Sequence, residues 1–185
     1  LEGAYGHLLD SDAEALDLSS ITCFEMDELM QTPSAVAPVI TYLFHRLEDR
    51  FDGRPALLIL DEAWLFLDHP VFGARLRDWL KTLRKKNVAV VFATQSLADI
   101  EGASIAPALI ESCPTRIFLP NERALEPTAQ ATYRRFGLSD RQIDILAKAI
   151  PKRAHYYTSP LGCRLFALGL GEVRLALCGA ALPAL

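Results

Sequence analysis

The sequence has 185 residues, of which 51% are hydrophobic, and a formal net charge of −4. These values predict one ordered domain or a piece of a larger protein, and they exclude a disordered chain and a broadly basic nucleic-acid binder. No apolar run approaches the roughly 20 residues that span a bilayer, residues 1–17 do not resemble a signal peptide, and the four scattered cysteines indicate reduced thiols in a cytosolic protein.

The first half of the chain alternates between strand and helix patterns. The expected elements are a strand at 18–26, a helix at 32–50, a turn at 51–55, a strand at 56–60, a helix at 70–86 and a strand at 87–95. Thr32 or Ser34 suits the N-cap of the first helix, and Pro70 suits the first turn of the second. The run ALLIL at 56–60 is typical of a parallel strand that is covered on both faces.

The second half continues this alternation and ends in short strands. The expected elements are a helix at 104–111, a strand at 115–120, helices at 124–137 and 138–150 (with Ser139 as the cap of the latter), and strands at 153–158, 163–170 and 172–179. This order predicts an α/β fold, with a mostly parallel sheet flanked by crossover helices and antiparallel hairpins at the C-terminal end. We expect a core at 18–120, a helical pair at 124–150 and C-terminal strands at 153–178.

Two adjacent acids, Asp61 and Glu62, follow the apolar strand at 56–60. Ligands of open α/β sheets lie beyond the carboxyl ends of the strands, so both acids are expected at a ligand-binding edge. One acid can hold Mg²⁺, directly or through water, and the next can polarise a water molecule for attack on a phosphate. The alternative is a pair of surface acids that begins a turn.

The next buried strand ends in ATQS at 93–96, which places Thr94 and Gln95 at the same edge. The neutral amide of Gln95 can donate and accept hydrogen bonds, so it could sense a γ-phosphate or orient the attacking water. Taken alone, it is more simply a polar strand end. The acid pair and the TQ pair together, at the ends of successive parallel strands, predict the second half of a nucleoside-triphosphatase core.

A basic stretch, LKTLRKKN at 80–87, ends the helix between these strands. Its cations complement the negative end of the helix dipole, with Asn87 as a suitable cap, and this is the simpler interpretation. The functional interpretation is an arginine finger that acts on the nucleotide of a neighbouring subunit, because such a group neutralises charge on the transferred phosphoryl group.

The phosphate-binding pattern GxxxxGK[ST] does not occur in these 185 residues. In P-loop enzymes the backbone N–H groups and the lysine of that loop hold the phosphates. Without the loop, Asp61 and Glu62 have no firmly held substrate. We therefore expect this chain, on its own, to have little or no ATPase activity.

Aromatic side chains and cations also occur together elsewhere in the sequence. Tyr133, Arg134 and Arg135 form one such group, and Lys152, Arg153, Tyr156 and Tyr157 form another. This mixture can bind single-stranded nucleic acid through stacking and phosphate contacts. The net negative charge favours solvated cations beside packed aromatics instead. The large aromatics at 64, 66, 72 and 79 are expected in the core or in subunit contacts.

Several motifs in order resemble the C-terminal half of the TrbE/CagE/VirB family, the ATPases of conjugation and type IV secretion. They are GRPALLILDEAWLFLDHPVF, WLKTLRKKNVAVVFATQSLADI, TRIFLPN and YRRFGLSDRQIDIL, and the resemblance runs from about residue 24 to 177. It implies a RecA-like P-loop NTPase core, present here in part because the Walker A element is absent. It also implies ATP and Mg²⁺ as cofactors and a homo-oligomer, a hexameric ring, with nucleotide at subunit boundaries.

The resemblance also implies roles for individual residues. DEAW is similar to the Walker B element, which assigns Asp61 to Mg²⁺ through water and Glu62 to the catalytic water. The TQS match assigns Gln95 to the sensor role and Thr94 to the nucleotide, and the RKKN stretch assigns Arg84 and Lys85 to action in trans. TRIFLPN implies that Asn121 lies near the edge of the nucleotide.

The leading functional hypothesis is an energy-coupling ATPase of a type IV secretion or conjugal transfer apparatus, which drives pilus assembly or the transfer of DNA or protein. The resemblance implies a cytoplasmic protein that is peripherally associated with the bacterial inner membrane and its secretion components, with DNA as a further partner. One alternative is a DNA translocase or helicase-like motor, because DEAW resembles a DExx box. Another is a non-catalytic oligomerisation module.

Overall fold

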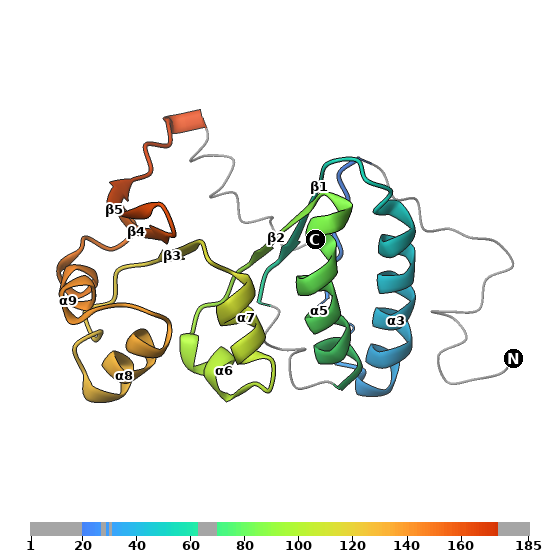
Figure 1. Ribbon diagram of the computed structural model, residues 1–185, viewed down its shortest axis with the longest axis horizontal. Coiled ribbons are helices and arrows are strands. Elements are labelled where there is room, and N and C mark those ends of the chain that lie inside the picture. Colours follow the sequence, from blue (N-terminus) through green and yellow to red (C-terminus); the bar gives the residue numbers. More distant parts are fainter. Residues whose placement is uncertain (1–19, 27–28, 30, 63–69, 174–185) are drawn as a thin grey trace, which may run out of the picture. The chain divides into compact units, whose positions relative to one another are not determined.

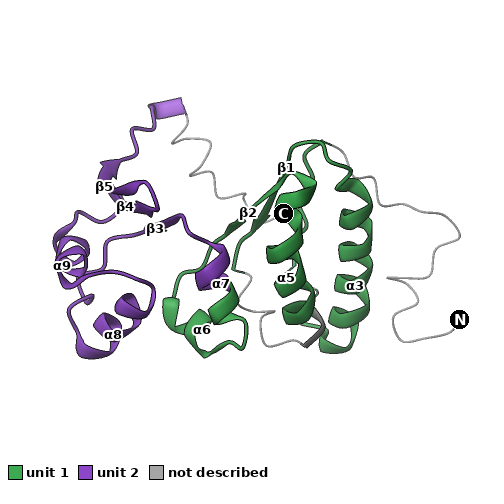
Figure 2. Cartoon of the chain, in the orientation of Figure 1, with its two compact units in different colours: residues 1–108 green, residues 109–185 purple. Residues whose placement is uncertain are grey.

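The computed structural model describes residues 20–26, 29, 31–62 and 70–173 of the 185. The chain divides into two compact units, residues 1–108 and residues 109–185 (Figure 2). The short helix α7 (Ala106–Ser112) spans the boundary between them. Each unit is described by itself.

Unit 1 contains helices on one strand pair. Its elements are α3 (Pro33–Arg50), β1 (Ala56–Leu60), α5 (Pro70–Thr82), a 3₁₀ turn η1 (Leu83–Lys86), β2 (Val88–Phe92) and α6 (Leu97–Gly102). The expected helix at 32–50 and the expected strands at 56–60 and 87–95 are therefore present. The expected helix at 70–86 tightens into the 3₁₀ turn for its last four residues, and Asn87 then adopts a left-handed conformation (φ 60). The expected helix at 104–111 is present as α7, and a second short helix that was not expected, α6, precedes it.

Helices α3 and α5 lie side by side (Figure 1) and form an aromatic core. The ring centroids of Phe44 and Trp79 are 4.4 Å apart, and those of Phe44 and Phe72 are 5.2 Å apart. The buried Trp79 donates its Nε1–H to Glu48 Oε1 at 2.5 Å, so its one polar atom has a partner, as a buried indole requires. Phe72 and Trp79 are thus core residues as expected, whereas Trp64 and Phe66 lie outside the described residues.

Strands β1 and β2 form a parallel pair in register, from Ala56 opposite Val88 to Leu60 opposite Phe92. This confirms the predicted parallel pairing, and both strands end at the same edge. The expectation that both faces are covered is wrong in the described structure, because Leu57 and Ile59 are each 61% exposed. The reason is the small number of strands: two strands and their one crossover helix cover a single face.

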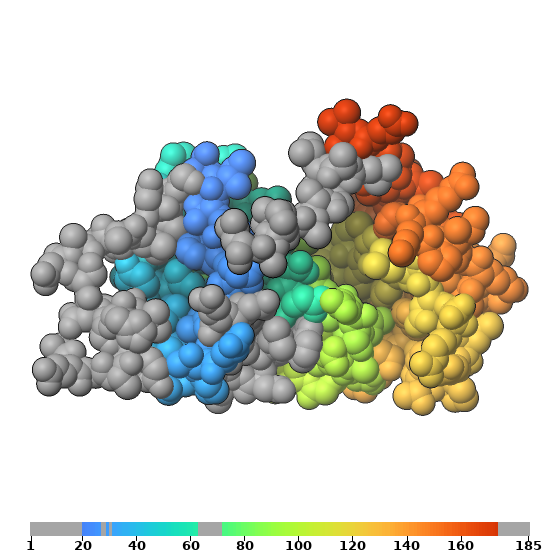
Figure 3. Space-filling model, turned by 180° about the vertical axis from the view of Figure 1, so that it is seen from behind, coloured from blue at the N-terminus to red at the C-terminus, as the bar shows by residue number. Residues whose placement is uncertain are grey.

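The strand expected at 18–26 is absent from the part that the structure describes. Residues 20–26 form a bend and irregular backbone, and Ile21 is 89% exposed. This segment lies at the surface in the view of Figure 3, where it is dark blue. A strand needs a neighbour to satisfy its backbone N–H and C=O groups, and β1 pairs only with β2 among the described elements.

Up to residue 173, where its described part ends, unit 2 contains a three-stranded antiparallel sheet and the two helices that pack on it. Its elements are β3 (Arg116–Phe118), α8 (Pro127–Arg135), α9 (Asp140–Lys148), β4 (Ala154–Ser159) and β5 (Gly162–Ala167). The sheet order is β3–β4–β5. The expected strand at 115–120 therefore exists, but it pairs antiparallel with β4 rather than extending the β1–β2 pair. The predicted C-terminal hairpin of β4 and β5 is present. The strand expected at 172–179 lies almost entirely outside the described residues.

The helices of unit 2 pack on one face of its sheet. The rings of Phe118 on β3 and Tyr133 on α8 are 6.0 Å apart, and Ile143 and Leu146 of α9 are fully buried. Ser139 holds the N-cap position of α9, as predicted, and its N–H donates to Gln142 Oε1 at 2.7 Å. No helix of the described ranges has both the length and the apolar character that a membrane-spanning segment requires.

Candidate functional site

The carboxyl edge of the β1–β2 pair brings four of the predicted site residues to one place. Asp61 and Glu62 follow Leu60, while Thr94 and Gln95 follow β2 by one residue. The Ala93 N–H donates to the Leu60 carbonyl at 2.9 Å, so the parallel register continues one step beyond the strands. Because the strands are parallel and in register, the acid pair and the TQ pair emerge side by side.

Glu62 has an unusual backbone conformation for its position. Its φ is 49°, which is left-handed, and it is one of three non-glycine residues with positive φ in the described structure. An L residue pays roughly 1–2 kcal/mol for this conformation, and such outliers cluster at functional sites. The left-handed residue also breaks the strand alternation, so Asp61 and Glu62 need not project to opposite faces as consecutive strand residues do. Asp61 is exposed and Glu62 is half-buried.

Thr94 and Ser96 form a tight turn that leaves Gln95 exposed between them. Thr94 Oγ1 donates to the Ser96 carbonyl at 3.1 Å and accepts from the Ser96 N–H at 3.3 Å. Ser96 then caps α6, because its Oγ accepts from the Ala98 N–H at 3.2 Å. Sequence analysis missed this role of Ser96, although the pattern Ser-x-x-Asp formed with Asp99 is a cap signal. These hydrogen bonds on both sides of Gln95 fix the position of its backbone at the edge of the sheet.

Arg84 and Lys85 lie at the opposite edge of the same strand pair. They belong to η1, which is followed by Asn87 and then by β2, and both are exposed. Asn87 Nδ2 donates to the Gly53 carbonyl at 3.2 Å and ties this end to the turn before β1. The strand β2 lies between these cations and Gln95, and its five residues alone span roughly 16 Å. The structure therefore does not bring Arg84 and Lys85 to the acid pair of their own chain.

Asn121 lies in unit 2, where its side-chain nitrogen, its side-chain oxygen and its backbone N–H all form hydrogen bonds within that unit. Its Nδ2 donates to Tyr133 Oη at 3.1 Å, its Oδ1 accepts from the Arg123 N–H at 3.0 Å, and its N–H donates to the Leu146 carbonyl at 3.2 Å. These bonds connect the residue to α8 and α9. The preceding Arg116 is equally engaged, because its guanidinium donates to the carbonyls of Phe136 and Ile110.

The residues at the carboxyl edge fit one half of a magnesium–triphosphate site. A single exposed carboxylate such as Asp61 suits Mg²⁺, which keeps several waters and takes its other ligands from substrate phosphates. No group of three or more His, Cys, Asp or Glu side chains within the described ranges forms an all-protein metal cage. The pattern GxxxxGK[ST] of the phosphate-binding loop does not occur in these 185 residues, so the fit extends to the magnesium side of such a site and not to the phosphate cradle.

Comparison with known proteins agrees with this geometry. The TraG P-loop domain family model matches residues 1–156. The chain is 52% identical over 181 residues, or 97% of its length, to conjugal transfer protein TrbE of Rhizobium radiobacter, of which it spans 22%. It is 34% identical over 157 residues, 83% of its length, to type IV secretion system protein CagE of Helicobacter pylori, of which it spans 16%. The curated relatives are thus several times longer than this chain.

A solved structure supports the fold as well. VirB4 of Thermoanaerobacter pseudethanolicus superposes with a TM-score of 0.56 at 21% identity, covering 74% of this chain and 37% of that one. The predicted α/β P-loop fold and the resemblance to the TrbE/CagE/VirB proteins are confirmed. On the match across residues 1–156, the chain belongs to the TraG P-loop domain family.

Proposed function

We propose that this chain is the catalytic half of an energy-coupling ATPase of a type IV secretion or conjugal transfer apparatus. The observation that carries the proposal is the shared edge at which Asp61, Glu62 and Gln95 emerge from two parallel strands. The relatives named as conjugal transfer and type IV secretion proteins support the choice of apparatus. The transported substrate, the secretion partners at the inner membrane and the cytoplasmic, membrane-peripheral location are parts of the same proposal.

In the proposed mechanism the residues divide the work of hydrolysis. Mg²⁺, when bound, would neutralise charge on the β- and γ-phosphates. Asp61 would hold that ion through water. Glu62 would orient a water molecule and accept its proton while the water oxygen bonds to the γ-phosphorus and the bond to the ADP oxygen breaks. The Gln95 amide would contact the γ-phosphate or the same water, with Thr94 shaping the turn that presents it.

The position of Arg84 and Lys85 supports action on a neighbouring subunit. They lie at the edge opposite the acid pair, so a ring in which that edge faces the next subunit would place them beside its nucleotide. A closed ring of identical subunits has such head-to-tail interfaces, and we include a hexamer in the proposal. Asn121, which the family resemblance implies to lie near the nucleotide, is proposed only to hold its own segment in unit 2, because its side-chain atoms are already engaged there.

The substitution Glu62→Gln tests the assignment in the longest natural polypeptide that contains this sequence and a phosphate-binding loop. We expect ATP binding to remain and steady-state turnover to be abolished, because the amide cannot accept the water proton. Wild-type turnover in this variant would remove Glu62 from the mechanism. The 185-residue chain itself should show little or no turnover, and a clear Asp61-dependent activity of this chain would contradict the proposed division of the site.

A further inference from the structure

The sheet of unit 2 has one face packed against helices and one open face. Side chains alternate between the two faces along each strand. Phe118 and Tyr156 point to the packed face and are 6% and 5% exposed. The register places Ile117 beside Tyr157, and Tyr157 beside Arg164, on the other side. Ile117 is 57% exposed, so this second side meets solvent. We define the open face as Ile117, His155, Tyr157, Arg164 and Phe166.

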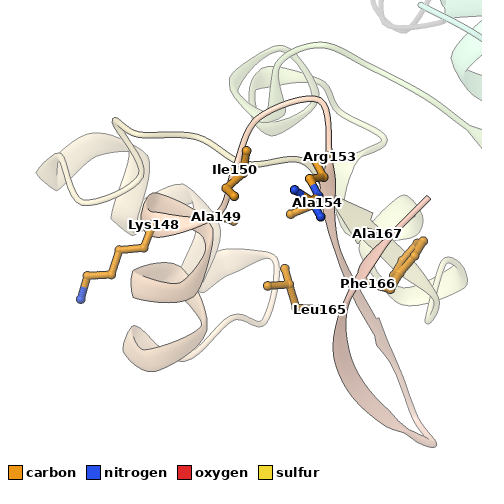
Figure 4. A pocket seen from close by; sticks show the side chains of 8 residues that line it. All are labelled: Lys148, Ala149, Ile150, Arg153, Ala154, Leu165, Phe166 and Ala167. Carbon is orange, nitrogen blue, oxygen red and sulfur yellow. The ribbon is translucent and has the colours of Figure 1, made fainter. Parts of the chain in front are cut away.

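Aromatic rings form much of the open face. His155 and Phe166 are cross-strand neighbours whose ring centroids are 5.3 Å apart at an interplanar angle of 25°, a stacked arrangement. Tyr157 lies two residues along β4 and is partly exposed. Figure 4 shows Leu165 and Phe166, consecutive on β5, projecting to opposite sides of the ribbon. The rings therefore lie together on the side away from the helices.

The charged side chains of the strands that form this face are all positive. The three strands contain no Asp or Glu, and no acid occurs between Asp144 and Glu172. The same stretch carries Lys148, Lys152, Arg153 and Arg164. Lys148 is paired with Asp144 at 2.7 Å, whereas the other three cations have no acidic partner within the described part of the chain. A cationic side chain that pairs with no acid of its own chain is available to bind an anionic ligand.

A hollow lies at one end of the strands, on the side of α9. It has a volume of about 380 Å³ and lies between the end of α9 and the β4–β5 ribbon, with Ile150, Arg153, Leu165 and Phe166 among its lining residues. In Figure 4 the Arg153 side chain lies at the hollow, while Lys148 points away from it. A cation thus borders this space just before β4 begins.

We propose that the open face binds single-stranded nucleic acid. Phe166 with His155, and separately Tyr157, would each stack a base, while Arg164, Arg153 and Lys152 contact phosphates. Aromatic side chains on an open sheet face, flanked by cations, recognise unpaired bases in this way because every base has a π-face. The structure also corrects the sequence grouping: Tyr133 and Tyr156 are buried in the core, whereas Phe166 and Arg164 join the face only through strand register.

The test uses the 185-residue chain and a fluorescein-labelled oligothymidylate of about 12 nucleotides, followed by fluorescence anisotropy without ATP. Tyr157→Leu and Phe166→Leu keep apolar volume but remove a ring, so each should weaken binding by roughly 5- to 150-fold. Arg164→Gln should reduce the slope of log affinity against log salt by about 0.7, the loss of one phosphate contact. Arg134→Gln, which removes an exposed cation on α8 paired with Asp140, is the matched control and should leave the affinity and slope unchanged.

Wild-type affinity in both leucine variants, with unchanged thermal unfolding, would overturn the proposal. If a leucine variant fails to fold, the exposed Arg164→Gln variant decides alone, and an unchanged salt slope in it counts against the site. Binding to vesicles of phosphatidylcholine and phosphatidylglycerol, lost in Leu161→Ser and without oligonucleotide binding, would assign this surface to a membrane instead. Leu161 is 99% exposed at the hairpin tip. The proposal goes beyond the proposed function, and its failure would leave the nucleotide site untouched because no ATP is involved.

Discussion

The left-handed backbone of Glu62 predicts that glycine at this position is more stable than alanine, the reverse of the usual order. The comparison is between Glu62→Gly and Glu62→Ala, because both remove the carboxylate and any interaction that it makes. At φ 49° an alanine retains the cost of a left-handed L residue, roughly 1–2 kcal/mol. Glycine avoids that cost but loses roughly 0.5–1 kcal/mol more backbone entropy than alanine on folding.

The difference favours the glycine variant by about 0.5–1 kcal/mol, which corresponds to a midpoint about 1–4 °C higher for a chain of this size. Thermal unfolding followed by far-ultraviolet circular dichroism on the 185-residue chain measures it. Ala74→Gly, at an exposed position of α5 in the same unit, is the control and should lower stability by about 1 kcal/mol. An alanine variant at position 62 that is as stable as the glycine variant would refute the strained conformation and its use as evidence for a functional site.

Three further predictions follow from other parts of the molecule. If Arg84 acts in trans in a ring of the full polypeptide, an equal mixture of inactive Arg84→Ala and Glu62→Gln subunits should recover about a quarter of wild-type turnover, because half of the sites keep Glu62 and half of those have a neighbour with Arg84. No recovery would place Arg84 in cis, and an active Arg84→Ala variant would place it outside catalysis. Trp79→Phe keeps the aromatic packing but removes the donor to Glu48, so urea unfolding should show a loss of about 1–3 kcal/mol, against about 3–5 kcal/mol for Trp79→Ala. A Trp79→Phe variant as stable as the wild type would show that the hydrogen bond contributes little. Burial raises the pKa of the Cys113 thiol, so less of it is thiolate at about pH 8. Mass spectrometry after iodoacetamide treatment should therefore find Cys113 modified more slowly than the exposed Cys23. The difference between the two rates should become smaller as the pH rises.

Local patterns of the sequence were sufficient for the elements whose stability is local. The helix at 33–50 and the apolar strands at 56–60 and 88–92 follow from periodicity and from apolar runs, which are local properties of the sequence. Parallel pairing followed from the strand–helix–strand order. For the same reason the acid pair and the TQ pair could be placed at one edge before any coordinates, since parallel strands share their carboxyl ends.

Pairing between distant segments was decided only by the tertiary structure. The strand at 116–118 carries nothing in its sequence that selects β4 over β2 as its neighbour, and the segment at 20–26 has strand-forming residues but no partner among the described elements. The left-handed turn at Glu62 and the choice of Tyr156 rather than Tyr157 for the packed face also depend on the tertiary structure. Hydrogen bonds between strands are non-local, so the sequence can favour an extended segment without specifying what completes its ladder.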